Sequence, residues 1–154
     1  MRCKHDDVEN QIEFVPPKKG TIVGDLEFLD DFIIRGEKSN AIMKIFVRKI
    51  SNNFEKEIKI SNEPIGIPGI SLIQKYSNTS KIRIGWESLK TPSRVYEYDI
   101  KTEEKKIVKE VEIPSGHNPD NYIVERINAK AHDGKLIPIS LIRNKRFINR
   151  ENSK

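Results

Sequence analysis

The chain has 154 residues, a formal net charge of +5, 33% charged residues and a hydrophobic fraction of only 36%. Its one cysteine, Cys3, excludes a disulfide framework and a cysteine metal cluster, and no apolar run reaches the ~18 residues of a membrane span. These features predict a soluble cytoplasmic protein that has no membrane partner. Basic residues are interspersed with acidic ones along the chain, so nucleic-acid binding is not predicted.

The first half of the chain is predicted to alternate short strands with polar turns. Residues 1–24 are polar and contain the turn sequence Pro16–Gly20, so we expect a poorly ordered amino-terminal segment. Segments rich in Ile, Leu and Phe follow, and clusters of Gly, Ser and Asn interrupt them. The expected elements are one or two strands at 25–35, a turn at 36–40, a strand at 42–50, a turn at 51–53 and a strand at 55–60.

The second half is predicted to contain further strands, then a linker and a hairpin. Pro64 and Pro68 are expected to keep the chain out of a sheet until about Ile70. Residues 94–100 give the clearest strand signal, because aromatic or apolar residues alternate there with Val, Glu and Asp. The expected elements are a strand at 70–74, a second repeat unit that begins with a strand from Lys81, strands at 94–100 and 105–112, a linker at 114–121, and a hairpin of 122–131 and 135–142 around an Asp-Gly turn. No amphipathic helix is predicted.

Residues 32–60 and 82–110 resemble two copies of one unit at an offset of fifty positions. Residue character is shared by the pairs Phe32/Ile82, Ile34/Ile84, Ile45/Val95, Phe46/Tyr96, Ile50/Ile100, Ile58/Val108, Glu37/Glu87, Lys56/Lys106 and Lys59/Lys109. A repeat of this length built from short strands is typical of β-propeller blades. The predicted fold class is therefore all-β, with antiparallel sheets that form one to two propeller blades plus a C-terminal β-hairpin.

The sequence from Glu87 to Asp99 resembles the oligopeptidase B branch of the prolyl oligopeptidase family. It contains the phrase S-L-x-T-P followed by V-Y-E-Y-D, and the resemblance continues through 108–114, 121–126 and 131–141. The first 24 residues match poorly. The resemblance implies that the repeat units are the last one to two blades of the propeller. It also implies three segments, namely the poorly ordered 1–24, a partial propeller at 25–115, and a linker with the truncated start of an α/β-hydrolase domain at 116–154.

The same resemblance implies what the whole enzyme does. In this family it is a cytoplasmic serine endopeptidase that cleaves short peptides after Arg or Lys, and its propeller covers the active site. Catalysis there needs a Ser in a G-x-S-x-G elbow, an Asp and a His. This sequence contains no such elbow, so we predict a propeller fragment that is inactive alone and has no cofactor. The alternative is a non-catalytic binding or assembly module that complements separately encoded peptidase segments, or pairs with itself through open sheet edges.

No catalytic, cofactor-binding or metal residue is predicted, although several residues have suitable chemistry. The segment Gly69–Ile73 comes nearest to an elbow, but it lacks the second glycine. The interpretations that we favour are Ser71 as a strand residue, His132 and Asp133 as turn residues, His117 and Asp120 as linker residues, His5, Asp6 and Asp7 as part of a disordered terminus, Trp86 as a core residue, and Arg143, Lys145, Arg146, Arg150 and Lys154 as a solvated tail.

Overall fold

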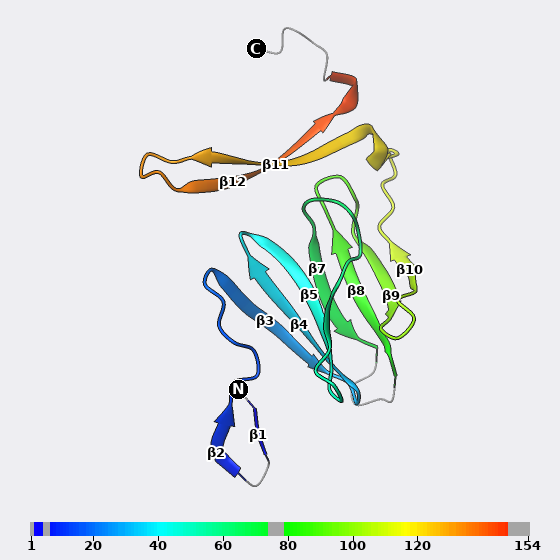
Figure 1. The fold of residues 1–154 in the computed structure, drawn as a ribbon. Helices are drawn as coiled ribbons and strands as arrows, with labels where there is room; N and C mark the ends of the chain where they lie inside the picture. Colours follow the sequence, from blue (N-terminus) through cyan, green and yellow to red (C-terminus); the bar gives the residue numbers. More distant parts are fainter. Residues whose placement is uncertain (1, 5–6, 74–78, 148–154) are drawn as a thin grey trace.

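The computed structural model describes residues 2–4, 7–73 and 79–147, and it confirms the all-β prediction. Within these residues the strands form two four-stranded antiparallel sheets and two two-stranded hairpins (Figure 1). The strands are β1 (Arg2–Lys4), β2 (Asp7–Ile12), β3 (Thr21–Phe28), β4 (Phe32–Ser39), β5 (Ile42–Lys49), β6 (Glu55–Ile58), β7 (Ile67–Leu72), β8 (Lys81–Glu87), β9 (Arg94–Asp99), β10 (Lys105–Glu110), β11 (Tyr122–Lys130) and β12 (Leu136–Asn144). Short 3₁₀ turns at Pro119–Asn121 and Lys145–Phe147 flank the β11–β12 hairpin.

The first sheet contains β3 to β6 in chain order, and the second sheet contains β7 to β10 in the same order. The segment 25–35 divides into two strands, because Leu29 and Phe32 exchange backbone hydrogen bonds and reverse the chain. β3 begins at Thr21, so the end of the segment expected to be poorly ordered is part of the first sheet. β7 begins at Ile67 rather than at Ile70. It tolerates Pro68 because it is an edge strand, where a missing N–H leaves no ladder bond unmade.

The turn predicted at 36–40 is wrong. β4 runs unbroken to Ser39, and the chain reverses at Asn40 and Ala41, whose φ angles are 50° and 56°. Two consecutive positive φ angles give a tight turn whose twist matches that of the antiparallel strands it joins. Gly36, which suggested a turn, lies instead in β4, where a Cβ would lie 3.8 Å from the backbone nitrogen of Asp25. That distance is an ordinary van der Waals contact, so Gly36 is a regular strand residue.

One apolar cluster joins the two sheets, and it follows the alternation of the strands. In β9 the predicted inward residues Tyr96 and Tyr98 are buried, and Ile100 directly after the strand is buried with them. Burial of alternate side chains on one face of each sheet is what a two-layer packing requires. The cluster contains Leu29, Phe32, Ile34, Ile45, Val47, Ile58, Ile60, Ile82, Ile84, Trp86, Tyr96, Tyr98 and Ile100.

The repeat holds for whole sheets, but its fifty-residue alignment is off by one for β4 and β8. In the first sheet Phe32 pairs with Lys49, whereas in the second Ile82 pairs with Tyr98 rather than with residue 99. Because successive side chains of a strand point to opposite faces, one residue of slip exchanges the two faces. Ile34 and Ile84 therefore do not occupy equivalent positions, and both enter the shared core. Successive propeller blades need this arrangement, since each packs one face on the opposite face of the next.

Two lysines add polar contacts between the sheets. The Nζ atom of Lys105 in β10 donates to the carbonyl oxygen of Ile60 at 2.6 Å. In return, the Nζ atom of Lys56 in β6 donates to the carbonyl oxygen of Ile100 at 3.4 Å and to the carboxylate of Glu103. The methylene stems of such lysines cover apolar surface while the amine reaches a carbonyl group. The sheets are thus joined by an apolar core and by one lysine from each side.

Trp86 provides a direct test of the packing between the sheets. Its side chain is 8% exposed, and a Cβ added at Gly66 would lie 2.1 Å from the Cη2 atom of its ring. We expect Gly66→Ala to lower the free energy of unfolding by about 1–3 kcal/mol, because a buried ring must move to admit the methyl group. Urea unfolding followed by the fluorescence of Trp86 and by circular dichroism measures this.

Gly69→Ala is the matched control for Gly66→Ala. An ideal Cβ at Gly69 meets no atom within 4 Å, and the residue lies in the neighbouring strand β7. Its substitution should leave stability unchanged or raise it slightly, because alanine restricts the unfolded chain. Equal destabilisation by the two substitutions would contradict the packing of Trp86 on Gly66.

Candidate functional site: a buried charge network and the turn at Ser88

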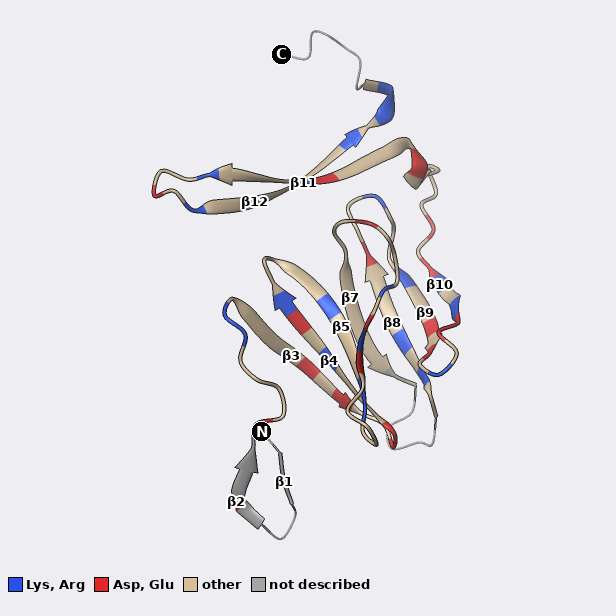
Figure 2. Ribbon diagram, in the orientation of Figure 1, with Lys and Arg blue, Asp and Glu red and all other residues tan. Residues whose placement is uncertain are grey.

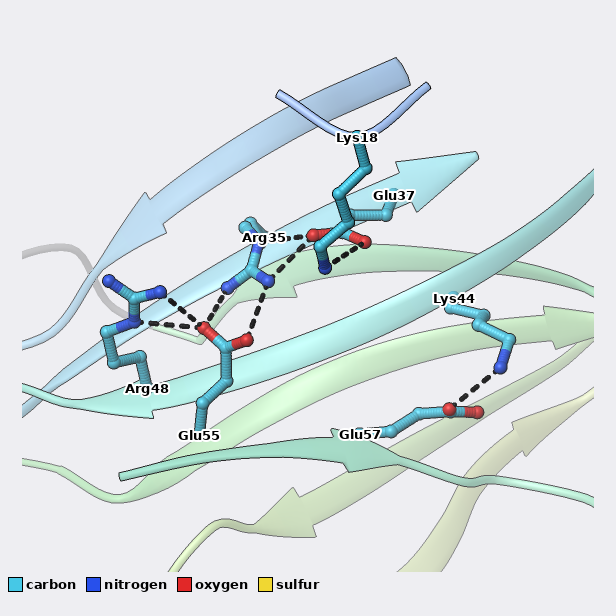
Figure 3. A network of polar contacts seen from close by, with 7 residues as sticks. All are labelled: Lys18, Arg35, Glu37, Lys44, Arg48, Glu55 and Glu57. Carbon is cyan, nitrogen blue, oxygen red and sulfur yellow. Dashed lines mark hydrogen bonds and ion pairs between the residues drawn. The ribbon is translucent and has the colours of Figure 1, made fainter. Parts of the chain in front are cut away.

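The face of the first sheet opposite the core carries a network of buried charges (Figure 3). Ile34 and Gly36 of β4 face the core, so Arg35 between them points to the opposite face of the sheet. Arg35 is nevertheless only 2% exposed. Its Nε and Nη2 atoms donate to Oε1 of Glu37 at 2.9 and 2.7 Å, and Nη2 also donates to Oε1 of Glu55 at 2.8 Å. Its Nη1 atom donates to the second oxygen of Glu55. One guanidinium group thus holds two carboxylates in the forked geometry that suits arginine.

A second arginine extends the network to the amino-terminal segment. Arg48 of β5 donates from Nε to Oε2 of Glu55 at 2.9 Å, and from Nη1 to the carbonyl oxygen of Phe14 at 2.9 Å. Its guanidinium carbon lies 4.5 Å from the centre of the Phe14 ring, a cation–π contact. Lys18 lies 3.6 Å from Glu37. The network therefore fastens residues 14–18 onto the first sheet.

Ion pairing fixes the protonation states of Glu55 and Arg35. Hydrogen bonding to Arg35 is the main reason that the pKa of Glu55 falls from 4.5 to about 2, and Arg48 contributes further. Burial by itself would lower the pKa of Arg35, but the hydrogen bonds that it donates to Glu55 and Glu37 outweigh burial and raise the pKa. Glu55 and Arg35 are therefore ionised and paired at neutral pH. The network can hold two chain segments together.

A second polar cluster explains the S-L-x-T-P phrase. The hydroxyl groups of Ser88 and Thr91 donate to the two carboxylate oxygens of Glu63, at 2.5 and 2.6 Å. The Ser88 oxygen also accepts the backbone N–H groups of Lys90 and Thr91, and the N–H of Ser88 bonds to the carbonyl oxygen of Thr91. Thr91 is only 5% exposed. The phrase thus builds a rigid turn between β8 and β9 and ties it to the segment between β6 and β7.

The structure does not assemble a catalytic group from the residues with suitable chemistry. Ser71 is exposed in β7 and pairs with Arg83. His132 is exposed, and its neighbour Asp133 accepts hydrogen bonds from the backbone N–H of Lys135 and pairs with its amine at 2.9 Å. These ties to Lys135 lower the pKa of Asp133. Asp133 is therefore a turn residue and does not orient His132.

The linker residues His117 and Asp120 have different hydrogen-bond partners. The Nε2 atom of His117 lies 2.6 Å from the carbonyl oxygen of Lys90, and its ring stacks on Tyr122. Asp120 donates its backbone N–H to Asn118.

Trp86 is a core residue as predicted, and its Nε1 atom is buried without a hydrogen-bond partner among the described residues.

The remaining candidates lie at the ends of the chain. His5, Asp6, Arg150 and Lys154 lie outside the described residues, and Asp7 is placed only as the first residue of β2. At the carboxyl end, Arg143 pairs with Glu125 at 2.9 Å. Residues 2–4, 7–73 and 79–147 contain no cluster of His, Cys, Asp and Glu suited to a metal ion, and no helix long and apolar enough to cross a membrane. Figure 2 shows Lys and Arg interspersed with Asp and Glu on both sheets.

The functionally informative residues that the sequence does not reveal are Arg35 and Glu63. Arg35 directly follows the apolar residues Phe32–Ile34, and a charged residue at the end of such a run does not by itself indicate a buried ion pair. Glu63 lies in a polar linker among other polar residues, so no pattern distinguishes it. Both act through partners distant in sequence, Glu55 and Ser88 respectively.

The charge network predicts an acid-sensitive fold. The pKa of Glu55 is lower in the folded chain than in the unfolded chain, so its contribution is present above about pH 4.5 and is lost as the pH falls toward 2. We expect Glu55→Gln to destabilise the chain by roughly 3 kcal/mol at pH 7, because Arg35 and Arg48 lose their shared partner. Its stability should also vary less between pH 5 and 2.5, as measured by urea unfolding across that range.

Glu57→Gln is the matched control, since Glu57 lies in the same strand and pairs with the more exposed Lys44 at 2.9 Å. A surface pair of this kind contributes about 0–1 kcal/mol. If Glu55→Gln and Glu57→Gln gave the same stability at pH 7, the network would not be a main support of the first sheet.

Comparison with known proteins assigns the chain to a family. Residues 1–111 match the family described as the N-terminal β-propeller domain of prolyl oligopeptidase. The matched span includes the first 24 residues, which showed little resemblance to the oligopeptidase B branch. The chain is 29% identical over 133 residues to dipeptidyl aminopeptidase BI of Pseudoxanthomonas mexicana, a match that covers 84% of this chain and 18% of that protein.

Solved structures share the fold. Oligopeptidase B from Trypanosoma brucei with covalently bound antipain, in a closed form, matches with a TM-score of 0.72 and 24% identity over 85% of this chain and 19% of its own. Oligopeptidase B from Leishmania major matches with a TM-score of 0.70 and 20% identity over 83% of this chain and 19% of its own. The chain therefore spans less than a fifth of the length of these relatives. It belongs to the prolyl oligopeptidase family and corresponds to part of the family's N-terminal β-propeller domain.

Proposed function

We propose that this chain supplies two propeller blades and the following hairpin to a cytoplasmic serine peptidase, and that it does not hydrolyse peptides by itself. The observation that carries the proposal is the match of both sheets and the hairpin to oligopeptidase B, over 85% of the chain at a TM-score of 0.72. The exposed position of Ser71 on an edge strand, paired with Arg83, also supports it. The single cysteine suits a reducing compartment.

The substrate class that we propose for the whole peptidase is a short peptide cleaved after Arg or Lys. The resemblance of 87–99 to the oligopeptidase B branch supports this choice. The relative from Pseudoxanthomonas mexicana is named a dipeptidyl aminopeptidase, which supports removal of short amino-terminal units as the second choice. Both activities need a nucleophile with a neighbouring base, and the described residues bring no such pair together.

The purified chain is expected to be inactive toward fluorogenic peptides with Arg or Lys before the scissile bond. Loss of one member of a triad usually costs several orders of magnitude in rate, and no serine in the part of the chain that the structure describes is hydrogen-bonded to a histidine. Turnover should equal that of the heat-denatured chain, and a fluorophosphonate probe should leave the chain unlabelled. Stoichiometric labelling that disappears in Ser71→Ala would overturn the proposal.

The alternative is an assembly module, and the exposed residues of β3 favour it. β3 is an edge strand of the first sheet, and Ile22, Val23, Leu26 and Phe28 are 67%, 45%, 42% and 51% exposed. An edge with free backbone groups and apolar side chains is a template for pairing with another chain. β10, an edge strand of the second sheet, contains Lys105, Lys106 and Lys109, and these charges oppose such pairing.

We therefore expect the isolated chain to be marginally stable and to self-associate through β3. Higher salt should increase association, because it screens the repulsion between chains of net charge +5. Size-exclusion chromatography with light scattering measures this, and Ile22→Lys should shift the chain toward monomer. Val108→Lys in β10 is the control and should change little. A monomer of 17.8 kDa with a cooperative thermal melt would show an independent domain and refute the assembly reading.

A further inference from the structure

We propose that Arg126 and His117 form a two-point latch that sets the orientation of the β11–β12 hairpin over the ends of the two sheets. The hairpin lies across one end of both sheets (Figure 1), and each point of the latch reaches a different sheet. The inference concerns the geometry of the chain and does not depend on the proposed peptidase function.

The first point joins the hairpin to the first sheet. The Nη2 atom of Arg126 in β11 donates to the backbone carbonyl of Asn40, at the tip of the β4–β5 turn. The turn is narrow, since Ser39 pairs with Ile42 on either side of it. Asn40 and Ala41 both have positive φ, a conformation that is costly for alanine and is retained only where the surroundings fix it. The direction of the acceptor carbonyl is therefore well defined.

The second point joins the linker before the hairpin to the second sheet. The Nε2 atom of His117 lies 2.6 Å from the carbonyl oxygen of Lys90. A carbonyl only accepts, so Nε2 carries the hydrogen, which both the neutral and the charged imidazole allow. Tyr122, the first residue of β11, stacks on the His117 ring with centroids 5.5 Å apart. Lys90 belongs to the turn that Glu63 holds through two hydroxyl groups, so this acceptor is rigid as well.

These two contacts largely determine the orientation of the hairpin, because the hairpin makes few other contacts with the sheets. β11 and β12 make most of their contacts with each other. Val124 lies on the same face of β11 as Arg126 and is 8% exposed, so this face is the one turned toward the sheets. On the opposite face Ile127 and Ile137 remain 47% and 52% exposed. A hairpin held at one point could pivot, whereas two points on different sheets and the covalent linker together fix its direction.

Residual dipolar couplings of the full ¹⁵N-labelled chain test the latch. In the wild type, the β11–β12 amides and the amides of both sheets are expected to fit one common alignment tensor. In Arg126→Ala the loss of a charge-assisted hydrogen bond should reduce the ratio of docked to undocked hairpin by about tenfold. The couplings of the hairpin should then shrink and require a separate tensor. Cross-strand contacts between Ile127 and Ile139, which are paired in the ladder, report that the hairpin itself stays folded.

Matched variants make the outcome specific. Arg143→Ala removes an arginine of the same hairpin that pairs with Glu125 and not with a sheet, and it should keep the common tensor. His117→Ala should release the hairpin, whereas His132→Ala at the exposed tip should not. The proposal is overturned if the wild-type hairpin aligns independently of the sheets, or if Arg126→Ala and His117→Ala retain the common tensor. If only one of these two substitutions released the hairpin, a single contact would hold it, and the proposal of two points would be overturned.

Discussion

The structure depends on one constraint, which is that each four-stranded sheet can bury only one of its faces against the other. Alternate residues of β4, β5, β8 and β9 fill the shared core, so the intervening residues must be accommodated elsewhere. The two sheets differ in how they accommodate the residues on the face away from the core. The first covers Arg35 and Glu37 with their own ion pairs and with residues 14–18, whereas the second exposes Arg83 and pairs Lys81 with Glu97 at 3.0 Å.

This constraint explains which parts of the fold the sequence predicts. Tyr96 and Tyr98 alternate with Glu and Val, and their burial follows from that pattern alone. Turn positions are harder, because a turn depends on where the chain can reverse as well as on residue type. Gly36 and Ser39 have turn character, yet β4 stays extended through them because it pairs with β3 on one side and with β5 on the other.

The one-residue misalignment of β4 and β8 in the repeat also comes from the turns. β4 and β5 are joined at Asn40 and Ala41, whereas β8 and β9 are joined by the longer turn around Ser88 and Thr91. A difference in turn length shifts the register of a hairpin, and one residue of shift exchanges the faces of a strand. Hydrophobic character survives the shift because Ile and Phe stand on both faces near the core. Residue similarity therefore identifies the repeat but cannot determine its register.

The turn at Ser88 also shows why the candidate sites remained hidden in the sequence. Its residues are contiguous and carry the family resemblance, but their partners Glu63 and His117 come from two other segments, each unremarkable by itself. Through these partners one turn connects the link between the sheets, the second sheet and the start of the hairpin. The sheets share an apolar core, whereas the hairpin meets them through hydrogen bonds that water can replace at modest cost. The physical division within this chain is thus between two sheets that share an apolar core and a hairpin that is tied to their turns by hydrogen bonds.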